Sequence, residues 1–498
     1  MKPQRNFDAV AFAVLAFLIV FGYAWHGGIG ISPDSIVYLS VARNLNAHAA
    51  LVDYNQGPLV DFPAFYPLFL AAMQFVSGMD VLTIAPVLNG LLFFLVILLS
   101  NAILKRFQVN SKFYRPLLLL LLALSPALLD IYSMLWSETL FIVILLSFIL
   151  TLCRYFNSRT LQNLFYCAIL AGLACVTRYA GVTLIGTGVM LLLFDPSLKV
   201  WKKVTHLSWF TGIAIVPLLL NLIHNAIVND QLTGPRQMTL SPLLGNVMLY
   251  GQELCKWIPG ISGHAVLSAL VAVVLFVLFA VLFFVRSWCN RNYTTAAQIT
   301  TTFFIVYSVF IVGMSTISHF EGMNNRLLSP LYIPMLMTCT FWIPEWLKGL
   351  RPVLRKYAAA FILTLALLFA VFELIKLKEL FREVNIYGIP GYTEDGWRTS
   401  ELSQCLKAHP HFFKNDFTLY SNAHEAVYFH SNLKADDLPH HVDKEYIKAF
   451  FEEDGQYLIW FNAIADNELI DLNFILKNRK VMKTYPFKDG TIYFLLKK

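Results

Sequence analysis

The feature that most constrains this chain is a series of apolar stretches, each long enough to cross a membrane as a helix. About 20 apolar residues span the hydrocarbon core of a bilayer in helical form. This length predicts eleven spans, near residues 7–25, 81–104, 115–130, 138–155, 161–177, 179–194, 204–223, 264–285, 298–317, 327–346 and 357–375. Only 14% of the 498 residues are charged, whereas about 25% is typical of soluble domains. The sequence therefore predicts a polytopic α-helical membrane protein.

The positions of the basic residues agree with this number of spans. Cytoplasmic loops carry an excess of Lys and Arg. With Lys2 and Arg5 inside, eleven alternating spans place every basic cluster between spans on the same side, at 105–115, 154–159, 199–203, 286–291 and 348–356. We therefore expect a cytoplasmic N-terminus and an extracytoplasmic C-terminal segment. The seven cysteines show no disulfide framework, which favours a bacterial inner membrane.

Two domains follow from this topology. Residues 1–375 form a membrane domain with a first external loop at 26–80 and a second large one at 224–263. The tail, 376–498, holds more than half of the 31 acidic residues of the chain. Short apolar runs and the turn at residues 488–490 predict a small α/β domain on the outer side, with strands at 417–421, 426–430 and 457–461 and a hairpin near 481–496.

The first external loop contains two segments with helical periodicity. The first begins at Ser32-Pro33-Asp34, where Ser suits the N-cap, Pro the first helical position and an acid the first turn. The second covers residues 64–76. Both are predicted to be amphipathic helices that lie at the membrane surface with their apolar faces down.

Acidic residues are scarce in the membrane portion, and those predicted to face outward include Asp34, Asp61 and Glu138. Glu138 follows Ser137 where the fourth span enters the membrane, and ionisable groups at that depth are costly and usually functional. A simpler role also fits Asp34 and Glu138, since an acid in the first turn of a helix complements the helix dipole. The residues alone leave both interpretations open.

Four arginines fall on the predicted outer side, although basic residues usually gather in cytoplasmic loops. They are Arg43, Arg178, Arg236 and Arg326. Each one alone is explained by snorkelling toward lipid headgroups or by pairing with an acid. Together they suggest an anionic ligand, because the guanidinium group matches phosphate with its fork of donors.

Several segments, taken in order, resemble the membrane-embedded GT-C glycosyltransferases. The resemblance is to the branch that holds the aminoarabinose transferases and the dolichyl-phosphate-mannose protein mannosyltransferases. The segments are SPDSIVYLSVARNL, DFPAFYPLFLA, LWSETLF, AGLACVTRYAGV, LTGPR, NNRLLSPLY and, in the tail, LYSNAHEAVYF. Ala64 stands where the family often has a second proline, and Phe62 stands where the aminoarabinose branch has a basic residue.

The resemblance implies an inverting glycosyltransferase with a polyprenyl-phosphate-linked sugar as donor. The acceptor would be a lipid A-type glycolipid, a cell-envelope glycan or a protein. Asp34 would be the general base, and Arg236, Arg326 and Arg178 would stabilise the phosphate leaving group. Glu138 would position the acceptor or hold a divalent metal ion, if there is one. The remaining substrate-binding candidates are Arg43, Tyr38, Asp61 and Tyr66.

Three other functions remain open at this point. A lipid-linked sugar flippase or transporter usually places charges in the middle of the membrane and shows paired repeats, and neither is evident here. A polysaccharide polymerase or ligase of another membrane fold also uses lipid-linked sugars. A sensor or scaffold would have its function in the tail. No basic stripe interleaved with aromatics is present, so nucleic acid is not an expected partner.

Overall fold

The computed structural model describes residues 7–107, 109, 111–234, 242–258, 264–289, 295–318, 322–414, 416–464 and 466–498. The chain divides into two compact units. The first comprises Met1–Trp25 and Leu59–Arg382, and the second comprises His26–Pro58 and Glu383–Lys498. The second unit thus contains residues 26–58 of the first external loop, which the sequence analysis grouped with the membrane helices.

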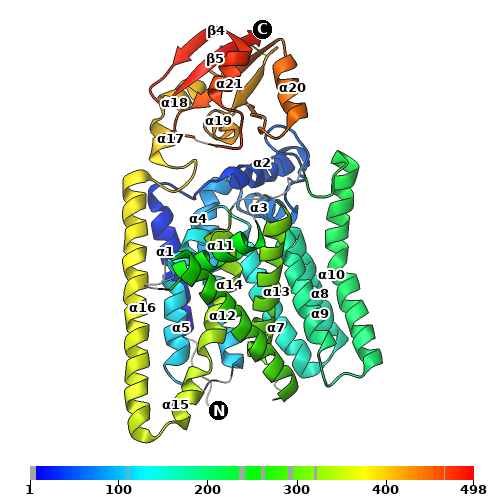
Figure 1. Cartoon of the computed structure of the whole chain (residues 1–498), viewed down its shortest axis with the longest axis vertical. Coiled ribbons are helices and arrows are strands. Elements are labelled where there is room, and N and C mark those ends of the chain that lie inside the picture. Colours follow the sequence, from blue (N-terminus) through cyan, green and yellow to red (C-terminus); the bar gives the residue numbers. More distant parts are fainter. Residues whose placement is uncertain are drawn as a thin grey trace. The chain divides into compact units, whose positions relative to one another are not determined.

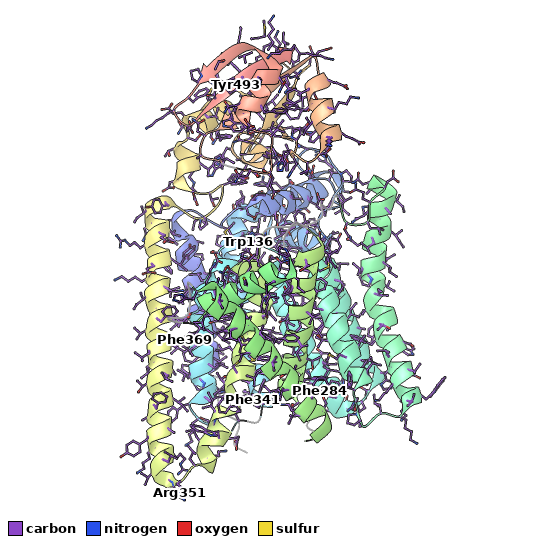
Figure 2. The ribbon with its side chains drawn as sticks, viewed as in Figure 1. Trp136, Phe284, Phe341, Arg351, Phe369 and Tyr493 are labelled. Atoms are coloured by element: carbon purple, nitrogen blue, oxygen red, sulfur yellow. The ribbon has the colours of Figure 1, made fainter. Side chains whose placement is uncertain are left out.

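The first unit is helical throughout its described secondary structure (Figure 1). Its helices are α1 (Phe7–Tyr23), α3 (Phe65–Ser77), α4 (Val81–Arg106), α5 (Tyr114–Ala123), α6 (Pro126–Tyr132), α7 (Glu138–Ser158), α8 (Leu161–Thr177), α9 (Val182–Leu193), α10 (Val200–Asn229), α11 (Leu243–Lys256), α12 (Ala265–Phe284), α13 (Ala296–Ile317), α14 (Asn325–Thr340), α15 (Ile343–Gly349) and α16 (Pro352–Tyr387). Helices satisfy their own backbone hydrogen bonds, as a hydrocarbon environment requires. Figure 2 shows Arg351 at the turn between α15 and α16.

Eight helices of the described chain are long and apolar enough to cross a membrane: Phe7–His26, Val81–Arg106, Glu138–Ser158, Val200–Asn229, Ala265–Ser287, Ala296–Ile317, Asn325–Gly349 and Pro352–Tyr387. The pair α5 and α6 makes a ninth if it is counted as one span bent by 48°. The bend falls at Ser125-Pro126, because proline lacks an amide hydrogen and clashes with the preceding turn. These helices confirm the predicted polytopic membrane fold.

The two remaining predicted spans, 161–177 and 179–194, correspond to α8 and α9, which are shorter. They have 17 and 12 residues. The backbone of Arg178 between them is extended, with φ −150° and ψ 139°, and the short turn η2 (Tyr179–Gly181) follows. At 1.5 Å per residue α8 is about 25 Å long, less than the hydrocarbon thickness of about 30 Å. The number of spans that length alone supports is therefore lower than eleven.

The second unit is an α/β structure around a five-stranded mixed sheet. Its strands are β1 (Thr418–Ser421), β2 (Asp436–Asp437), β3 (Gly455–Phe461), β4 (Arg479–Pro486) and β5 (Gly490–Lys497). Its helices are α2 (Pro33–His48), α17 (Asp395–Thr399), α18 (Glu401–Ala408), α19 (His424–Ser431), α20 (Lys444–Glu452) and α21 (Leu472–Asn478). The strand order is β2-β1-β3-β5-β4, with β1 parallel to both β2 and β3, and β5 antiparallel to β3 and β4.

Both faces of the sheet are buried, as the alternation along β3 shows. Tyr457, Ile459 and Phe461 pack into one apolar cluster together with residues of α18 and α19. Leu458 points to the opposite face, where Phe450 of α20 completes a second cluster with Ile475 of α21. Successive side chains of a strand point to opposite faces, so two helical layers cover this sheet. The predicted small α/β domain is confirmed.

The prediction of a strand at residues 426–430 was wrong, because this segment is helix α19. Its residues, Ala-Val-Tyr-Phe-His, have the β-branched and aromatic composition typical of strands. Ala426 and Val427 are buried in the cluster on one face of the sheet, and Asn432 ends the helix in the left-handed conformation. Packing against the sheet therefore decides the structure of this segment, against its weak local preference for a strand.

Residues of the first external loop are joined to the C-terminal part of the second unit by several contacts. The Tyr392 amide donates to the Ile31 carbonyl at 2.7 Å, and Asn55 Nδ2 donates to the Ala435 carbonyl at 3.1 Å. The Tyr54 ring stacks on Tyr428 with centroids 4.7 Å apart. Helix α2 is therefore carried by the α/β unit.

Gly391 is required at the contact with Ile31. Its φ is +88°, and a Cβ built there would lie 2.1 Å from the Ile31 carbonyl oxygen.

We expect Gly391→Ala to lower the stability of the second unit by about 2 kcal/mol or more, because both the backbone and the contact become strained. Limited proteolysis within residues 26–58 measures the effect. Gly396→Ala is the control, since a Cβ there meets nothing within 4 Å, and equal proteolysis of the two variants would contradict the prediction.

His424 makes the stability of the second unit depend on pH. Burial lowers the pKa of His424, but the hydrogen bond to Asp437 and the charges of Glu425, Asp437 and Asp436 raise it by more, so the pKa lies above its usual value. The Asp437 Oδ1 and Glu425 Oε1 atoms are each 3.4 Å from a ring nitrogen of His424. A raised folded-state pKa stabilises the folded form at low pH.

We expect this stabilisation to be complete below the unfolded pKa of about 6.5 and to be lost as the pH rises through the higher folded pKa. Protease resistance of the second unit should then fall as the pH rises above about 6.5. In His424→Gln this fall should disappear, whereas in His411→Gln, which changes an exposed histidine, it should remain. A pH profile of His424→Gln like that of the wild type would refute the assignment.

Candidate functional site

A buried acidic residue at the start of α7 is the centre of the candidate site in the first unit. The side chain of Glu138 is 0% exposed. Asn89 of α4 holds the segment before it, donating to the carbonyls of Tyr132 at 2.9 Å and Met134 at 2.8 Å. The Tyr132 hydroxyl donates to the Thr139 carbonyl at 3.1 Å. Because these bonds join both sides of the break between α6 and α7, the position of Glu138 is fixed.

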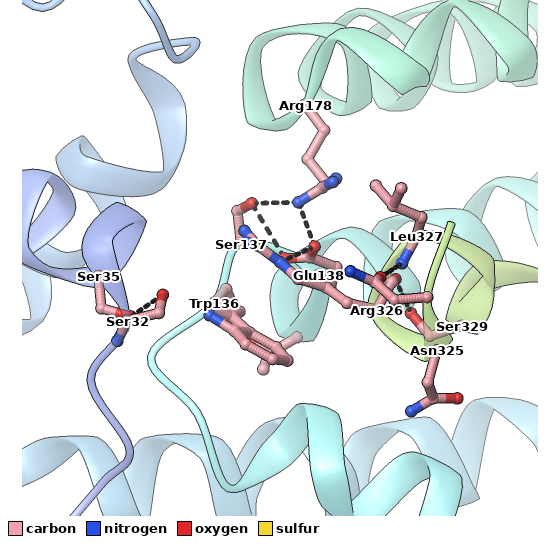
Figure 3. Close-up of polar contacts among 12 residues, drawn as sticks. Ser32, Ser35, Trp136, Ser137, Glu138, Arg178, Asn325, Arg326, Leu327 and Ser329 are labelled. Carbon is pink, nitrogen blue, oxygen red and sulfur yellow. Dashed lines mark hydrogen bonds and ion pairs between the residues drawn. The ribbon is translucent and has the colours of Figure 1, made fainter. Parts of the chain in front are cut away.

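Two arginines meet the same carboxylate oxygen of Glu138 (Figure 3). Arg178 Nη1 lies 2.5 Å and Arg326 Nε lies 2.6 Å from Glu138 Oε1. Arg178 Nη1 also donates to Ser137 Oγ at 2.9 Å. The cluster therefore has two positive charges and one negative charge, and it joins the start of α7 to the end of α8 and the start of α14.

Local backbone structure explains why both arginines reach this point. Arg178 follows the last residue of α8, where the chain turns away from the helix. Arg326 lies in the first turn of α14, whose N-cap Asn324 accepts a hydrogen bond from the Leu327 amide at 3.0 Å. The Arg326 guanidinium also stands over the Trp136 ring, 4.6 Å from its centroid, a favourable cation–π arrangement. The Arg326 side chain is therefore held from two sides.

The predicted residues of the first external loop are divided between the two units. Asp34, Tyr38 and Arg43 lie on α2 in the second unit, and Asp61 and Tyr66 lie in the first. Asp34 is in the first turn of α2 and half-buried, and Tyr38, one turn later, is 2% exposed. The Ser32 amide donates to Ser35 Oγ at 3.1 Å, which stabilises the start of this helix. The predicted helix start is confirmed.

Asp61 and Tyr66 lie near the start of α3. The segment leading to them is anchored on α10, since Asn225 Nδ2 donates to the Val60 carbonyl at 3.2 Å and the Ala64 amide donates to Asn221 Oδ1 at 3.2 Å. Tyr66 is 1% exposed, and Asp61 is exposed. Arg236, the remaining predicted residue, lies outside the described residues.

The surroundings of Glu138 do not fit a divalent metal ion. Two guanidinium groups already occupy the carboxylate, and their positive charges would repel a cation. In the described part of the chain, no group of three or more His, Cys, Asp or Glu side chains is arranged to hold a metal. The surroundings of Glu138 therefore suit guanidinium groups and not a metal ion.

Two contributors to the site were missed in the sequence: Asn89 and Trp136. Trp136 and Ser137 belong to the quoted segment LWSETLF, so the signal for Trp136 was present but was not assigned a role. Asn89 is a polar residue inside a predicted span, which is a sign of a specific partner.

Fold and site together define a polytopic membrane protein with a buried cluster of arginines and one carboxylate at its helix ends. No protein-family model matches this sequence, and no curated protein matches it. Solved structures do resemble it. ArnT from Cupriavidus metallidurans matches in the apo state with a TM-score of 0.57 and 12% identity over 97% of both chains. The same enzyme bound to undecaprenyl phosphate matches with a TM-score of 0.59 and 13% identity over 99% of this chain and 98% of that one.

A second similar structure is the archaeal oligosaccharyltransferase AglB from Archaeoglobus fulgidus, in complex with an inhibitory peptide and a dolichol-phosphate. Its TM-score is 0.51, with 12% identity, and the match covers 97% of this chain and 74% of that one. At such low identity these matches establish the fold. The chain has the ArnT-like membrane fold, and the predicted resemblance to the GT-C glycosyltransferases is confirmed at the level of the fold.

Removing the charge of Glu138 should destabilise the first unit, because the guanidinium groups of Arg178 and Arg326 would lose the buried carboxylate that they share. We expect Glu138→Gln to reduce the free energy of unfolding by about 3 kcal/mol, measured by thermal unfolding in detergent. The control is Glu345→Gln, which breaks a pair with Lys348 whose side chains are 58% and 43% exposed and should cost less than about 0.5 kcal/mol. Similar melting temperatures for the two variants would show that the buried cluster contributes no stability.

Proposed function

We propose that this protein is an inverting glycosyltransferase that moves a sugar from a polyprenyl-phosphate donor to a hydroxyl of an extracytoplasmic acceptor. The observation that carries the proposal is the buried cluster in which Arg178 and Arg326 share the single carboxylate of Glu138. The fold supports it, since ArnT with the same fold binds undecaprenyl phosphate. AglB, in turn, was solved with dolichol-phosphate.

The two guanidinium groups of this cluster suit a phosphate leaving group. Cleavage of the sugar–phosphate bond leaves a polyprenyl phosphate anion. Guanidinium groups held in place before the reaction stabilise such charge strongly in a site of low dielectric constant. We assign this role to Arg326 and Arg178 and, as further candidates, to Arg236 and Arg43. Glu138 acts through them as a positioning residue that fixes the two guanidinium groups.

Asp34 is the proposed general base. The acceptor oxygen attacks the anomeric carbon from the face opposite the phosphate, and the bond from that carbon to the phosphate oxygen breaks. Asp34 takes the proton of the acceptor hydroxyl, so the products are the inverted glycoside and polyprenyl phosphate. Tyr38, Asp61 and Tyr66 are proposed to contact the substrates.

The acceptor is proposed to be a lipid A-type glycolipid, a cell-envelope glycan or a protein. We place the protein in a bacterial inner membrane, with a cytoplasmic N-terminus and the α/β unit outside. This orientation agrees with the distribution of basic residues, and it gives the enzyme access to acceptors outside the cytoplasm.

The test of the proposed function compares the wild type with Asp34→Asn in liposomes that contain labelled undecaprenyl-phosphate sugars and a membrane glycolipid extract. We expect transfer by the wild type and a loss of about two orders of magnitude in Asp34→Asn, because general-base catalysis contributes that much or more. Asp80→Asn is the matched control. Asp80 caps α4 by accepting from the Leu82 amide at 3.0 Å, which Asn does equally well.

Two results would contradict the proposal. If Asp34→Asn transferred sugar as fast as the wild type, Asp34 would be a helix-start residue only. If neither protein transferred sugar, while the labelled lipid moved across the bilayer, a flippase would be the better interpretation.

A further inference from the structure

Arg286 is a buried arginine at the end of α12 that pairs with no acidic side chain among the described residues. It lies in the short π-helical turn η3 (Val285–Cys289) and is 8% exposed. Its Nη1 donates to Thr301 Oγ1 of α13 at 3.0 Å, and its guanidinium stands over the Phe341 ring, 4.6 Å from the centroid. A guanidinium group has five N–H donors, so these contacts leave most of its donors unused.

The missing carboxylate distinguishes Arg286 from other buried arginines of the first unit. Arg115 of α5 pairs with Asp8 of α1 at 2.5 Å, and the two arginines of the candidate site share Glu138. The sequence directly after η3, residues 290–294, contains no Asp or Glu. A buried charge without a partner is costly, so a bound anion would stabilise Arg286 in its position.

Gln298 on α13 has a second polar atom without a partner at the same place. Gln298 is 0% exposed, and its Nε2 donates to the Phe283 carbonyl at 3.3 Å and to Ser287 Oγ at 3.0 Å. The bond to the carbonyl fixes the orientation of the amide, because only its nitrogen donates. Gln298 Oε1 makes no hydrogen bond to a described residue, and an unpaired buried acceptor is destabilising.

The two groups belong to one small region between α12 and α13. Gln298 and Thr301 are three residues apart on α13, so they share one face of that helix. Gln298 bonds to Ser287, and Thr301 bonds to the adjacent Arg286. We call Arg286, Ser287, Gln298 and Thr301 the α12–α13 site. It combines unused guanidinium donors with one unused amide acceptor.

The α12–α13 site lies far along the bundle from the cluster around Glu138. Arg326, which pairs with Glu138, is in the first turn of α14, and Phe341 directly follows the last residue of that helix. At 1.5 Å per residue these two positions are about 22 Å apart along α14. Figure 2 shows Phe284 and Phe341 in the part of the first unit toward Arg351.

Exposed tryptophans and basic clusters mark this end of the bundle as a membrane–water interface. Trp342 and Trp346, just after α14, are 48% and 47% exposed. Tryptophan is enriched at the level of the lipid headgroups. The basic clusters predicted to be cytoplasmic include 286–291 and 348–356, which flank the same region. In the proposed orientation, the anions next to Arg286 are therefore the phospholipid headgroups of the inner leaflet.

The chemistry of the site fits a headgroup that carries its own hydrogen-bond donor. The guanidinium fork matches the oxygens of a phosphate. Gln298 Oε1 needs a donor beside that phosphate, and the ammonium group of ethanolamine or a hydroxyl of glycerol provides one. The methylated ammonium of phosphatidylcholine has no N–H and would leave Gln298 Oε1 unpaired.

We propose that the α12–α13 site binds one phospholipid of the inner leaflet, with its phosphate on Arg286 and its headgroup donor on Gln298 Oε1. The site selects phosphatidylethanolamine and phosphatidylglycerol over phosphatidylcholine. The bound phosphate is the counter-charge of Arg286 and joins the ends of α12 and α13. This binding does not depend on the proposed transfer of sugar.

The test is a lipid titration of the purified chain in detergent, followed by native mass spectrometry. The lipids are phosphatidylethanolamine, phosphatidylglycerol and phosphatidylcholine with the same acyl chains. Arg286→Gln removes the guanidinium, and Gln298→Glu places a carboxylate beside Arg286 that competes with the phosphate. Arg351→Gln is the matched control, because it removes the same charge at an exposed position.

We expect the wild type and Arg351→Gln to bind phosphatidylethanolamine at least about tenfold more tightly than phosphatidylcholine, as an unpaired buried acceptor implies. Arg286→Gln and Gln298→Glu should each weaken the binding of phosphatidylethanolamine about tenfold or more. Gln298→Glu should keep the wild-type melting temperature in lipid-free detergent, because its carboxylate gives Arg286 an internal partner. Its loss of lipid then has no origin in unfolding.

The inference is overturned if both variants bind the three lipids as the wild type does, or if the wild type binds phosphatidylcholine as tightly as phosphatidylethanolamine. It is also overturned if lipid loss in both variants occurs only together with a lower melting temperature, since Arg286 and Gln298 would then be structural. Inorganic phosphate tests the other source of the same anion. If it raises the melting temperature of the wild type but not of Arg286→Gln, while lipid binding is equal in the two, the site binds a soluble anion and the lipid assignment fails.

Discussion

The contact on which the rest of the membrane unit depends is the carboxylate of Glu138 between two guanidinium groups. Charged groups away from water are tolerated when they are paired and hydrogen-bonded. This requirement joins α7, α8 and α14 at one point and explains why α8 ends at Arg178. The Asn89 bonds to the loop before α7 serve the same contact, because they set where Glu138 enters the bundle.

The same contact is the centre of the proposed chemistry. It brings two guanidinium groups to one place, and guanidinium matches the geometry of a phosphate group with its fork of donors.

The α/β unit has a role that its position at the end of the chain does not suggest. It incorporates residues 26–58, so helix α2, with Asp34 in its first turn, belongs to the α/β unit. Two contacts show this. Gly391 has no Cβ and so leaves room for the Ile31 carbonyl oxygen, and the Tyr54 ring stacks on the Tyr428 ring. A scaffold of buried strands holds a helix more rigidly than a surface loop does.

Hydrophobic length and local capping were enough to predict most of the helices. The helix start at Ser32-Pro33-Asp34 and the strands at 457–461 and around the 488–490 turn were found because their signals are local. The strand predicted at 426–430 was wrong because burial against the sheet, and not composition, decides that segment. Residues 161–177 and 179–194 were each predicted to span the membrane. The break at Arg178 leaves two shorter helices there, of 17 and 12 residues.

The sequence by itself determined that this is a polytopic membrane protein with an α/β tail, because apolar length and strand alternation are properties of neighbouring residues. It also singled out Glu138, Arg178 and Arg326 as unusual. Only the tertiary structure decided that these three meet and that residues 26–58 belong with the tail. Such contacts join residues up to several hundred positions apart, and no local pattern encodes their distance in space.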